Sequence, residues 1–316
     1  MLSPSGEGRG GRDVRVYEVG PRDGLQNEAL PVATADKLRY IDLLASAGLH
    51  EIEVTSFVSP AAIPQLADAD AVMAGLARRS GVRYPVLVPN LRGLARAEAA
   101  GVDAIAVFTA ATDAFTERNI GMTVAGSLNA FAPVLARARE LGWWRRAYVS
   151  TAFGCPFTGR VEPERPVEVA LRLLDLGAEE ICYGDTIGVA VPGQVRALVE
   201  RSEAAGVPLD RTAFHFHDTR GTALANVSAA LDLGIRTFDA STGGTGGCPY
   251  APGAAGNLAT EDLVYLLQAD GWRHGIDLAR LLAAARFIAG VLGRPLASKV
   301  GQAGGWDATT GAAIGR

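Results

Sequence analysis

The sequence predicts an α/β protein folded as a (β/α)8 TIM barrel with extra C-terminal helices. Short apolar runs alternate with amphipathic helical stretches, eight such runs occur, and no linker or break in composition divides the chain. Repeated strand–helix units indicate a parallel sheet, and eight units close a barrel, for which 316 residues are enough. A doubly wound open sheet is the structural alternative.

The eight expected strands are short runs rich in β-branched and aromatic residues. In chain order they cover residues 14–19, 51–57, 84–88, 104–109, 147–153, 180–183, 213–217 and 236–240. The stretch after the first run has the 3.6-residue spacing of a helix at Leu38, Ile41 and Leu44. Glycine after several helical stretches, as at Gly48, is typical of a helix C-terminus.

We expect a disordered N-terminal tail over residues 1–12, followed by a single catalytic domain over residues 13–316. The tail is rich in Gly, Ser and Arg and lacks the apolar segment of a secretory signal. The cysteines, Cys155, Cys182 and Cys248, are too few for a disulfide framework, which favours a reducing cytoplasm.

The composition argues against two classes of partner and one class of chemistry. A net charge of −4 without a long basic run provides no electrostatic footprint for nucleic acid. No apolar stretch approaches the roughly 20 residues of a membrane helix. Only two of the 30 basic residues are lysines, Lys37 on an expected surface helix and Lys299 near the C-terminus. Because imine chemistry requires a desolvated lysine, carbon–carbon bond chemistry here would use a metal.

The strongest local motif lies in the seventh run. His215 and His217 alternate with Phe214 and Phe216, so the two imidazoles face the same side of the strand. Active sites of barrels lie at the C-terminal ends of the strands, where two imidazoles make a good metal pair. The motif alone leaves open a pair of core histidines satisfied by hydrogen bonds.

A second motif follows the first run directly. Gly20, Pro21 and Gly24 predict a turn that presents Arg22 and Asp23 over the barrel mouth. Asp23 can supply a hard oxygen ligand, and Arg22 a fixed positive fork for a developing oxyanion. An exposed turn with a surface ion pair is the alternative.

A glycine-rich segment, residues 243–250, follows the eighth run and suggests a loop that closes over a ligand. Cys248 is its acid–base group, although an incidental cysteine in a structural loop is the alternative. Asn257 offers a carbonyl oxygen for a metal, or it caps a helix beginning near Leu258.

Two further sets of polar residues lie at strand positions. Glu53 alternates with Ile52 and Val54 and should face the barrel interior, where an unpaired carboxylate is costly; this favours a functional role. Asp185 and Thr186 close the sixth run, where they either contact a substrate or form a structural turn.

Together these motifs predict that one aspartate, two histidines and one asparagine converge at the barrel mouth. Such a mixed oxygen and nitrogen set, with room for water and substrate, suits octahedral Mg²⁺ or Mn²⁺ better than a closed tetrahedral zinc site.

Six motifs resemble the 3-hydroxy-3-methylglutaryl-CoA lyase family, in the same order over most of residues 14–300. They are GPRDGLQNE (20–28), TSFVSP (55–60), GDTIGV (184–189), HDT (217–219), GGCPYA (246–251) and GNLATEDLVY (256–265). The resemblance implies that the metal ligands are Asp23, His215, His217 and Asn257. It also implies catalytic roles for Arg22, Cys248, Asp23, His215 and Glu53, and substrate contacts for Arg22, Gln26, Asp185 and Thr186.

The activity that the resemblance implies is a retro-Claisen cleavage of 3-hydroxy-3-methylglutaryl-CoA to acetyl-CoA and acetoacetate, as in leucine degradation. The metal, Mg²⁺ or Mn²⁺, chelates the tertiary hydroxyl and a neighbouring oxygen, and Asp23 or His215 takes the hydroxyl proton. Arg22 stabilises the enolate oxygen, and Cys248 protonates the enolate carbon. We expect a cytoplasmic homodimer whose partner is an acyl-CoA thioester.

Three residues and one segment depart from the family pattern and bear on the substrate tail and the CoA preference: Thr245, Arg220, Cys182 and residues 293–295. A lyase for a longer or branched 3-hydroxyacyl-CoA is therefore one alternative. A condensing synthase of the isopropylmalate type is another, although such synthases usually carry a further C-terminal domain. A non-enzymatic protein that binds metal or acyl-CoA is the alternative from another class.

Overall fold

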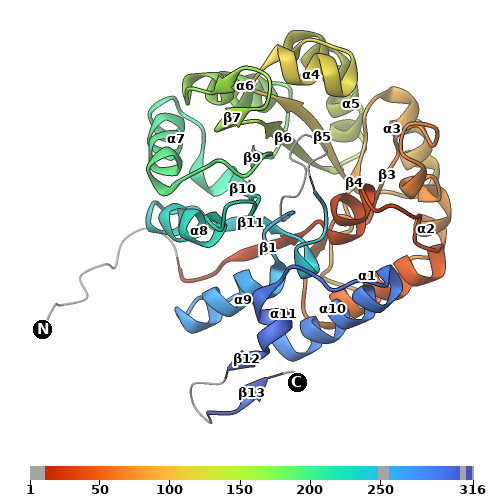
Figure 1. The fold of residues 1–316 in the computed structure, drawn as a ribbon. Helices are drawn as coiled ribbons and strands as arrows, with labels where there is room; N and C mark the ends of the chain where they lie inside the picture. The colour runs from red at the N-terminus through yellow and green to blue at the C-terminus, as the bar shows by residue number, and fades with distance from the viewer. Residues whose placement is uncertain (1–10, 248–255, 307–310, 315–316) are drawn as a thin grey trace, which may run out of the picture.

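The computed structural model describes residues 11–247, 256–306 and 311–314 (Figure 1). The helices form a ring around a central set of strands, and the C-terminal helices lie along one side of this ring (Figure 1).

The central sheet is a closed barrel of parallel strands. Around the barrel they follow the order β2 (Glu51–Ile52), β1 (Arg15–Glu18), β11 (Thr237–Ala240), β10 (Thr212–Phe216), β9 (Glu180–Asp185), β6 (Trp144–Ser150), β5 (Ala104–Ala110), β4 (Val86–Leu87) and β3 (Thr55–Ser56). β2 and β3 belong to one segment, residues 51–56, so the ladder returns to where it starts. Val54 N donates to Pro85 O at 3.0 Å across this junction. The predicted barrel is confirmed, and the open sheet is excluded.

The surrounding helices follow the strands in the expected alternation. They are α1 (Thr34–Ser46), α2 (Ala69–Gly75), α3 (Leu91–Ala99), α4 (Asp113–Ile120), α5 (Val124–Glu140), α6 (Glu164–Asp175), α7 (Pro192–Ala204), α8 (Ala223–Asp232) and α9 (Thr260–Ala269). The expected extra C-terminal helices are α10 (Leu278–Leu292) and α11 (Lys299–Ala303). Short turns of π- or 3₁₀-helix are η1 (Gly20–Gly24), η2 (Pro64–Leu66), η3 (Leu209–Arg211) and η4 (Thr242–Gly244), and two hairpins pair β7 (Gly154–Cys155) with β8 (Gly159–Arg160) and β12 (Gly305–Trp306) with β13 (Ala313–Ile314).

The two faces of the barrel wall are packed differently. Between the strands and the helices lies the main hydrophobic core, to which Phe214 and Phe216 belong as a stacked pair with ring centroids 5.2 Å apart. A separate small cluster, made only of strand residues, lies inside the barrel: Leu87, Ala106, Tyr148, Cys182 and Ala213. The rest of the interior is available to the polar side chains described below.

The fifth strand begins earlier than predicted. β6 covers Trp144–Ser150, whereas the sequence predicted residues 147–153. The arginines at its start suggest a loop, but Arg146 is fully buried and pairs with acids on neighbouring strands. The strand ends at Ser150, because the next residue, Thr151, has a φ of 55° that is incompatible with extended backbone.

Lys37 is on the predicted helix, α1, but the expectation of a surface position is wrong. Its side chain is buried, and Nζ donates to Gln65 O and to Asp68 Oδ1, both at 2.6 Å. The segment that contains η2 covers this part of α1, which sequence periodicity cannot reveal.

Among the described residues, no helix combines the length and the apolar character needed to cross a lipid bilayer.

In the C-terminal extension, α10 packs on the barrel. α10 contacts α1, and Leu281 is fully buried in the same core as Leu44 of α1. We therefore predict that Leu281→Ala lowers the free energy of unfolding by about 2–5 kcal/mol, because it leaves a cavity in the shared core. Urea denaturation followed by far-UV circular dichroism measures this change.

The matched control is Ala283→Gln, at an exposed position on the same helix, which should change the free energy of unfolding by less than about 0.5 kcal/mol. Both variants should unfold in one transition. A separate early transition in Leu281→Ala, with the main transition unchanged, would show that α10 belongs to a second domain.

Candidate active site and metal centre

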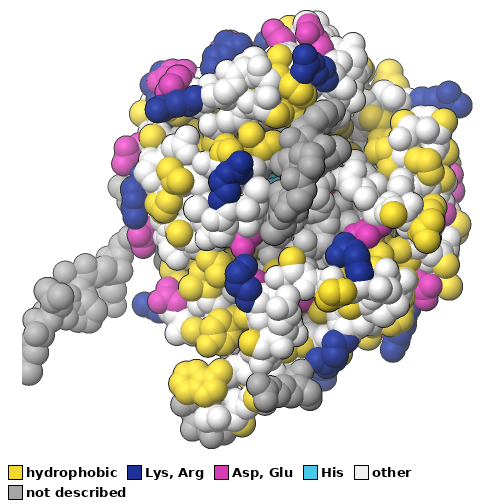
Figure 2. Space-filling view, viewed as in Figure 1, with side chains coloured by type: hydrophobic (Ala, Val, Ile, Leu, Met, Phe, Trp, Pro, Cys, Tyr) yellow, Lys and Arg dark blue, Asp and Glu magenta, His cyan; other side chains and the backbone are white. Residues whose placement is uncertain are grey.

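Three potential metal ligands meet at the C-terminal end of the barrel. Asp23 lies in η1 after β1, His215 lies in β10, and His217 follows that strand. One ligand atom from each of these side chains lies within 4.8 Å of the others. The histidines face the interior because Phe214 and Phe216 occupy the opposite face of β10. The mouth of the barrel is turned to the viewer in Figures 1 and 2, and Figure 2 shows the edge of a histidine side chain within it.

Asp23 is presented by a tight turn. In η1, the carbonyl of Val19 accepts from the backbone N–H groups of Arg22, Asp23 and Gly24, at 3.2, 2.8 and 3.1 Å. A side chain at Gly24 would collide with Thr245, so the glycine lets the turn approach the loop that follows β11.

The buried carboxylate of Glu18 holds these two loops together. It accepts from the backbone N–H groups of Gly20 and Thr242, both at 2.8 Å, and from the hydroxyl of Thr260 at 2.6 Å. Burial raises its pKa. The first and last loops of the barrel mouth are therefore joined by one acid that the sequence analysis did not single out.

Arg22 is buried and held from two sides. Its Nε pairs with Glu53 Oε1, and its Nη1 donates to Asp23 Oδ1 at 2.7 Å. Burial alone would lower the pKa of Arg22, but the two carboxylates outweigh it and raise the pKa, so the guanidinium stays charged. Glu53 faces the interior as expected, and its Oε2 accepts from the hydroxyls of Tyr17 and Tyr148 at 2.8 and 2.7 Å.

The residues present fit a metal ion, because two buried polar atoms of the candidate ligands have no hydrogen-bond partner within the described part of the chain. They are Oδ1 of Asn257 and Nδ1 of His217. The amide nitrogen of Asn257 donates to Asp23 Oδ2 at 2.7 Å and to Thr245 O at 2.9 Å, which leaves the carbonyl oxygen as its ligand atom. α9 begins at Thr260 after Ala259, so the expectation that Asn257 caps that helix is wrong.

The protonation states of the cluster also suit a cation. Burial alone would raise the pKa of Asp23, but Arg22 and His215 lower it to about 2. Burial, together with the neighbouring His215, lowers the pKa of His217 to about 3. Near neutral pH the aspartate is therefore ionised and the imidazole of His217 is neutral, and these are the forms that bind metals.

The structure adds a second acid that the motifs missed. Asp239 of β11 is buried, and its Oδ2 lies 3.1 Å from His215 Nδ1, while its Oδ1 accepts from Arg146 Nη2 at 2.6 Å. Burial alone would lower the pKa of His215, but Asp239 outweighs it and raises the pKa. Asp239 alternates with Phe238 as Glu53 does with its apolar neighbours, so the same strand rule would have found it.

The other expected substrate contacts lie near the mouth but have structural partners. The carboxylate of Asp185 accepts from Val189 N at 2.8 Å and from Ala190 N at 3.1 Å, and burial raises its pKa to about 6. Thr186 Oγ1 accepts from Thr151 N at 2.8 Å. Their contacts with a substrate remain a prediction.

Gln26 also lies at the mouth, where its Oε1 is 3.5 Å from Arg22 Nη1. Cys248, the expected proton donor, lies outside the described residues. Cys155 and Cys182 are buried with free thiols, the second of them inside the barrel 3.6 Å from Asp239 Oδ2.

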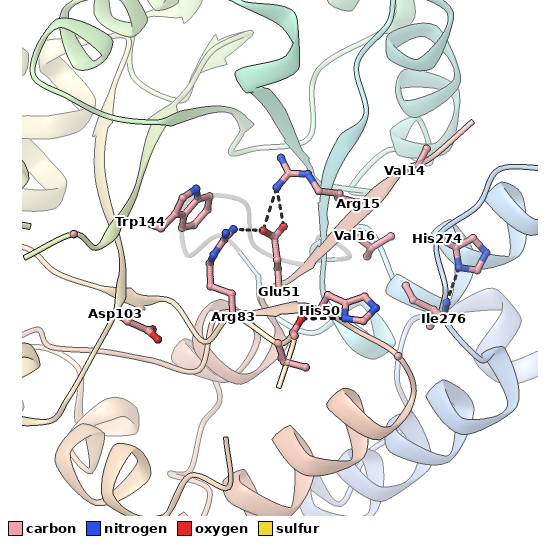
Figure 3. Close-up of a pocket in the computed structure, with 14 residues that line it drawn as sticks. Val14, Arg15, Val16, His50, Glu51, Arg83, Asp103, Trp144, His274 and Ile276 are labelled. Atoms are coloured by element: carbon pink, nitrogen blue, oxygen red, sulfur yellow. Dashed lines mark hydrogen bonds and ion pairs between the residues drawn. The ribbon is translucent and has the colours of Figure 1, made fainter. Parts of the chain in front are cut away.

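A hollow of about 550 Å³ lies at the opposite end of the barrel, where the strands begin (Figure 3). Arg15, Glu51, Arg83 and Trp144 line it, and both arginines pair with Glu51. In this fold that end is associated with stability rather than catalysis, so the candidate site is the cluster at the mouth.

Comparisons with known proteins agree with this geometry. A family model described as HMGL-like matches residues 13–288. The 3-hydroxy-3-isohexenylglutaryl-CoA/hydroxy-methylglutaryl-CoA lyase of Pseudomonas aeruginosa is 48% identical over 292 residues, which are 92% of this chain and 97% of that enzyme. The cytoplasmic 3-hydroxy-3-methylglutaryl-CoA lyase of Rattus norvegicus is 47% identical over 290 residues, which are 92% of this chain and 84% of that enzyme.

A solved HMG-CoA lyase from Acinetobacter baumannii, in complex with coenzyme A and 3-methylmalate, has a TM-score of 0.89 and 37% identity, covering 96% of this chain and 97% of that one. The sequence motifs, the closed barrel and these matches all lead to the same assignment: the chain belongs to the HMGL-like family.

Proposed function

We propose that this chain is a metal-dependent carbon–carbon lyase that cleaves 3-hydroxy-3-methylglutaryl-CoA into acetyl-CoA and acetoacetate. The observation that carries the proposal is the convergence of Asp23, His215 and His217 beside the buried guanidinium of Arg22. The names of the related lyases from Pseudomonas aeruginosa and Rattus norvegicus support the reaction. An assay that follows acetoacetate release from the purified protein tests it directly.

Asp23, His215, His217 and Asn257 would hold the metal, through one carboxylate, two imidazoles and one amide oxygen. This set suits Mg²⁺ or Mn²⁺ because hard oxygen ligands predominate once substrate and water are added. When bound, such an ion acidifies the tertiary hydroxyl of the substrate and neutralises charge on its oxygens. The proton of that hydroxyl goes to Asp23 or His215, which both lie in the cluster.

Arg22 provides the positive charge for the enolate that remains after the carbon–carbon bond breaks. Its guanidinium is oriented by Glu53 and Asp23, so it need not reorganise during the reaction. Glu53 thus acts through Arg22, as its orienting partner. Cys248 then donates its thiol proton to the enolate carbon, a role that rests on the chemistry of the thiol and on its glycine-rich surroundings in the sequence.

The substrate class that we assign is an acyl-CoA thioester, supported by the related structure that contains coenzyme A. A larger substituent at carbon 3 is the second candidate, because the relative from Pseudomonas aeruginosa is also named for the isohexenyl substrate. The values of kcat/KM for a panel of 3-hydroxy-3-alkylglutaryl-CoA thioesters distinguish the two. We also assign a cytoplasmic homodimer, although the related enzymes have both cytoplasmic and mitochondrial names.

The first prediction concerns the metal. Exhaustive chelation should abolish activity, and Mg²⁺ or Mn²⁺ should restore it. His217→Ala should weaken Mn²⁺ binding, because one of four protein ligands is lost; binding is measured by electron paramagnetic resonance of free Mn²⁺. His274→Ala, at the other end of the barrel, is the control and should bind Mn²⁺ normally. Full activity of the metal-free protein would exclude this mechanism.

The second prediction concerns Arg22. Arg22→Lys should lower kcat about a hundredfold or more, on the order of 3 kcal/mol, because lysine keeps the charge but loses the fork held by Glu53 and Asp23. Steady-state kinetics measure it. Arg83→Lys is the control, since Arg83 pairs with Glu51 at the far end of the barrel, and it should leave kcat unchanged. An unchanged kcat with a raised KM in Arg22→Lys would restrict Arg22 to substrate binding.

The third prediction concerns Cys248. Cys248→Ser should lose several hundredfold in turnover, within the ~10²–10⁴ range of a positioned acid, because a hydroxyl is a much weaker acid than a thiol. The variant should still bind Mn²⁺. An acyl-CoA analogue should also slow alkylation of Cys248, while the buried Cys155 and Cys182 gain no comparable protection. Near-normal turnover in Cys248→Ser would remove the thiol from the reaction.

A further inference from the structure

A series of charged side chains, linked by ion pairs, runs through the barrel from the hollow at its base to the cluster of candidate metal ligands. Arg15, at the edge of the hollow in Figure 3, pairs with Glu180. Glu180 pairs with Arg146 at 3.0 Å, and Arg146 pairs with Asp239 at 2.6 Å. Asp239 in turn contacts His215 at 3.1 Å. Of these five side chains, only that of Arg15 is substantially exposed.

The backbone brings these partners together. Arg146 and Glu180 are register partners in β6 and β9, and His215 and Asp239 are register partners in β10 and β11. Side chains at paired positions of neighbouring strands point to the same face, here the interior. The contacts are therefore built into rigid strands and do not depend on loops.

Burying such a series of charged side chains carries a large desolvation cost. Buried ion pairs are often no more stable than apolar side chains of the same size, so stability alone is a weak reason for their presence. Asp239, at one end of the series, contacts the candidate metal ligand His215, which points to a role in holding that ligand.

We propose that Asp239 is the positioning residue of the metal centre, and that Arg146 anchors it. This inference rests on the metal centre of the proposed function. Asp239 Oδ2 accepts the proton of His215 Nδ1, which leaves Nε2 of the same ring as the ligand atom. Both nitrogens of His215 are then occupied, so of the two candidate bases Asp23 takes the hydroxyl proton. Asp239 Oδ1 accepts from Arg146 Nη2, so the carboxylate is held at both oxygens and cannot turn away.

The two histidines of the cluster differ in this respect. His217 Nδ1 has no hydrogen-bond partner among the residues that the structure describes, so this nitrogen is open to an ion and, unlike Nδ1 of His215, is not held by an acid. His215 is thus the ligand whose orientation is set before any ion binds, and the affinity of the centre should depend on Asp239.

Asparagine at position 239 tests this dependence because it keeps the shape and changes the hydrogen bonding. A carboxylate can accept from Arg146 and from His215 at the same time, whereas an amide has one accepting oxygen and one donating nitrogen. With the oxygen facing Arg146, the amide nitrogen faces His215 Nδ1 and favours the ring form with its proton on Nε2. That proton occupies the atom that should bind the metal.

The first measurement uses the unaltered protein. Its sequence contains only four histidines, so the ¹⁵N signals of the rings can be assigned by nuclear magnetic resonance. We expect a proton on Nδ1 of His215 in the metal-free protein, bonded to Asp239. A neutral His215 ring with its proton on Nε2 would overturn the proposal, and this result does not depend on whether any variant folds.

The second measurement is Mn²⁺ affinity by electron paramagnetic resonance. Asp239→Asn should weaken Mn²⁺ binding about 10–100-fold. Glu180→Gln is the matched control: Glu180 is also buried and pairs with Arg146, but both Arg146 and Asp239 separate it from His215, so Mn²⁺ affinity should be unchanged. Far-UV circular dichroism confirms that both variants are folded.

The outcomes separate the two ideas. If the unaltered protein binds no Mn²⁺, the metal centre of the proposed function is wrong, and the role of Asp239 falls with it. If the unaltered protein and a folded Asp239→Asn bind Mn²⁺ equally well, the metal centre stands and the positioning role is wrong. An equal loss of affinity in Glu180→Gln would also overturn the role, because the effect would then follow any lost charge.

Discussion

Inside the closed barrel, Arg146 Nη2 donates to Asp239 Oδ1 at 2.6 Å, and both side chains are buried. Neither charge can be hydrated, so each depends on the other. The guanidinium carbon of Arg146 also lies 3.8 Å from the ring centroid of Tyr17 and 4.9 Å from that of Tyr148, and both tyrosine hydroxyls bond to Glu53. This pair therefore links Glu53, the acid that holds Arg22, to Asp239, the acid that contacts His215.

Asp23 differs in its surroundings and in its role from three other carboxylates around the mouth. Asp23 lies beside cationic and imidazole groups, which lower its pKa to about 2 and keep it ionised. Glu18, Asp185 and Glu261 are buried and accept from backbone N–H groups of the loops, and burial raises the pKa of Glu261 to about 8. The ionised Asp23 suits a cation, whereas the other three carboxylates hold the loops that surround it.

Much of this arrangement follows from local rules. Alternation in the seventh strand places both histidines on one face, and the same rule turns Glu53 inward. The partners of buried charges do not follow, because Asp239 lies 93 residues from Arg146 and their contact depends on how the strands align around the barrel. For the same reason the sequence around the arginines at the start of β6 is typical of a loop. The segment that covers Lys37 likewise cannot be predicted from helix periodicity.

The scarcity of lysine has a consequence for a protein that handles activated acyl groups. A thioester can transfer its acyl group to an unprotonated amine, so lysines near such compounds are open to accidental amide formation. Of the two lysines here, Lys37 is enclosed and bonded to Gln65 and Asp68, and Lys299 alone has an exposed side chain, with its ammonium 3.0 Å from Asp218. Arginine carries nearly all of the positive charge and stays protonated, so few side-chain amines are present to accept an acyl group in this way.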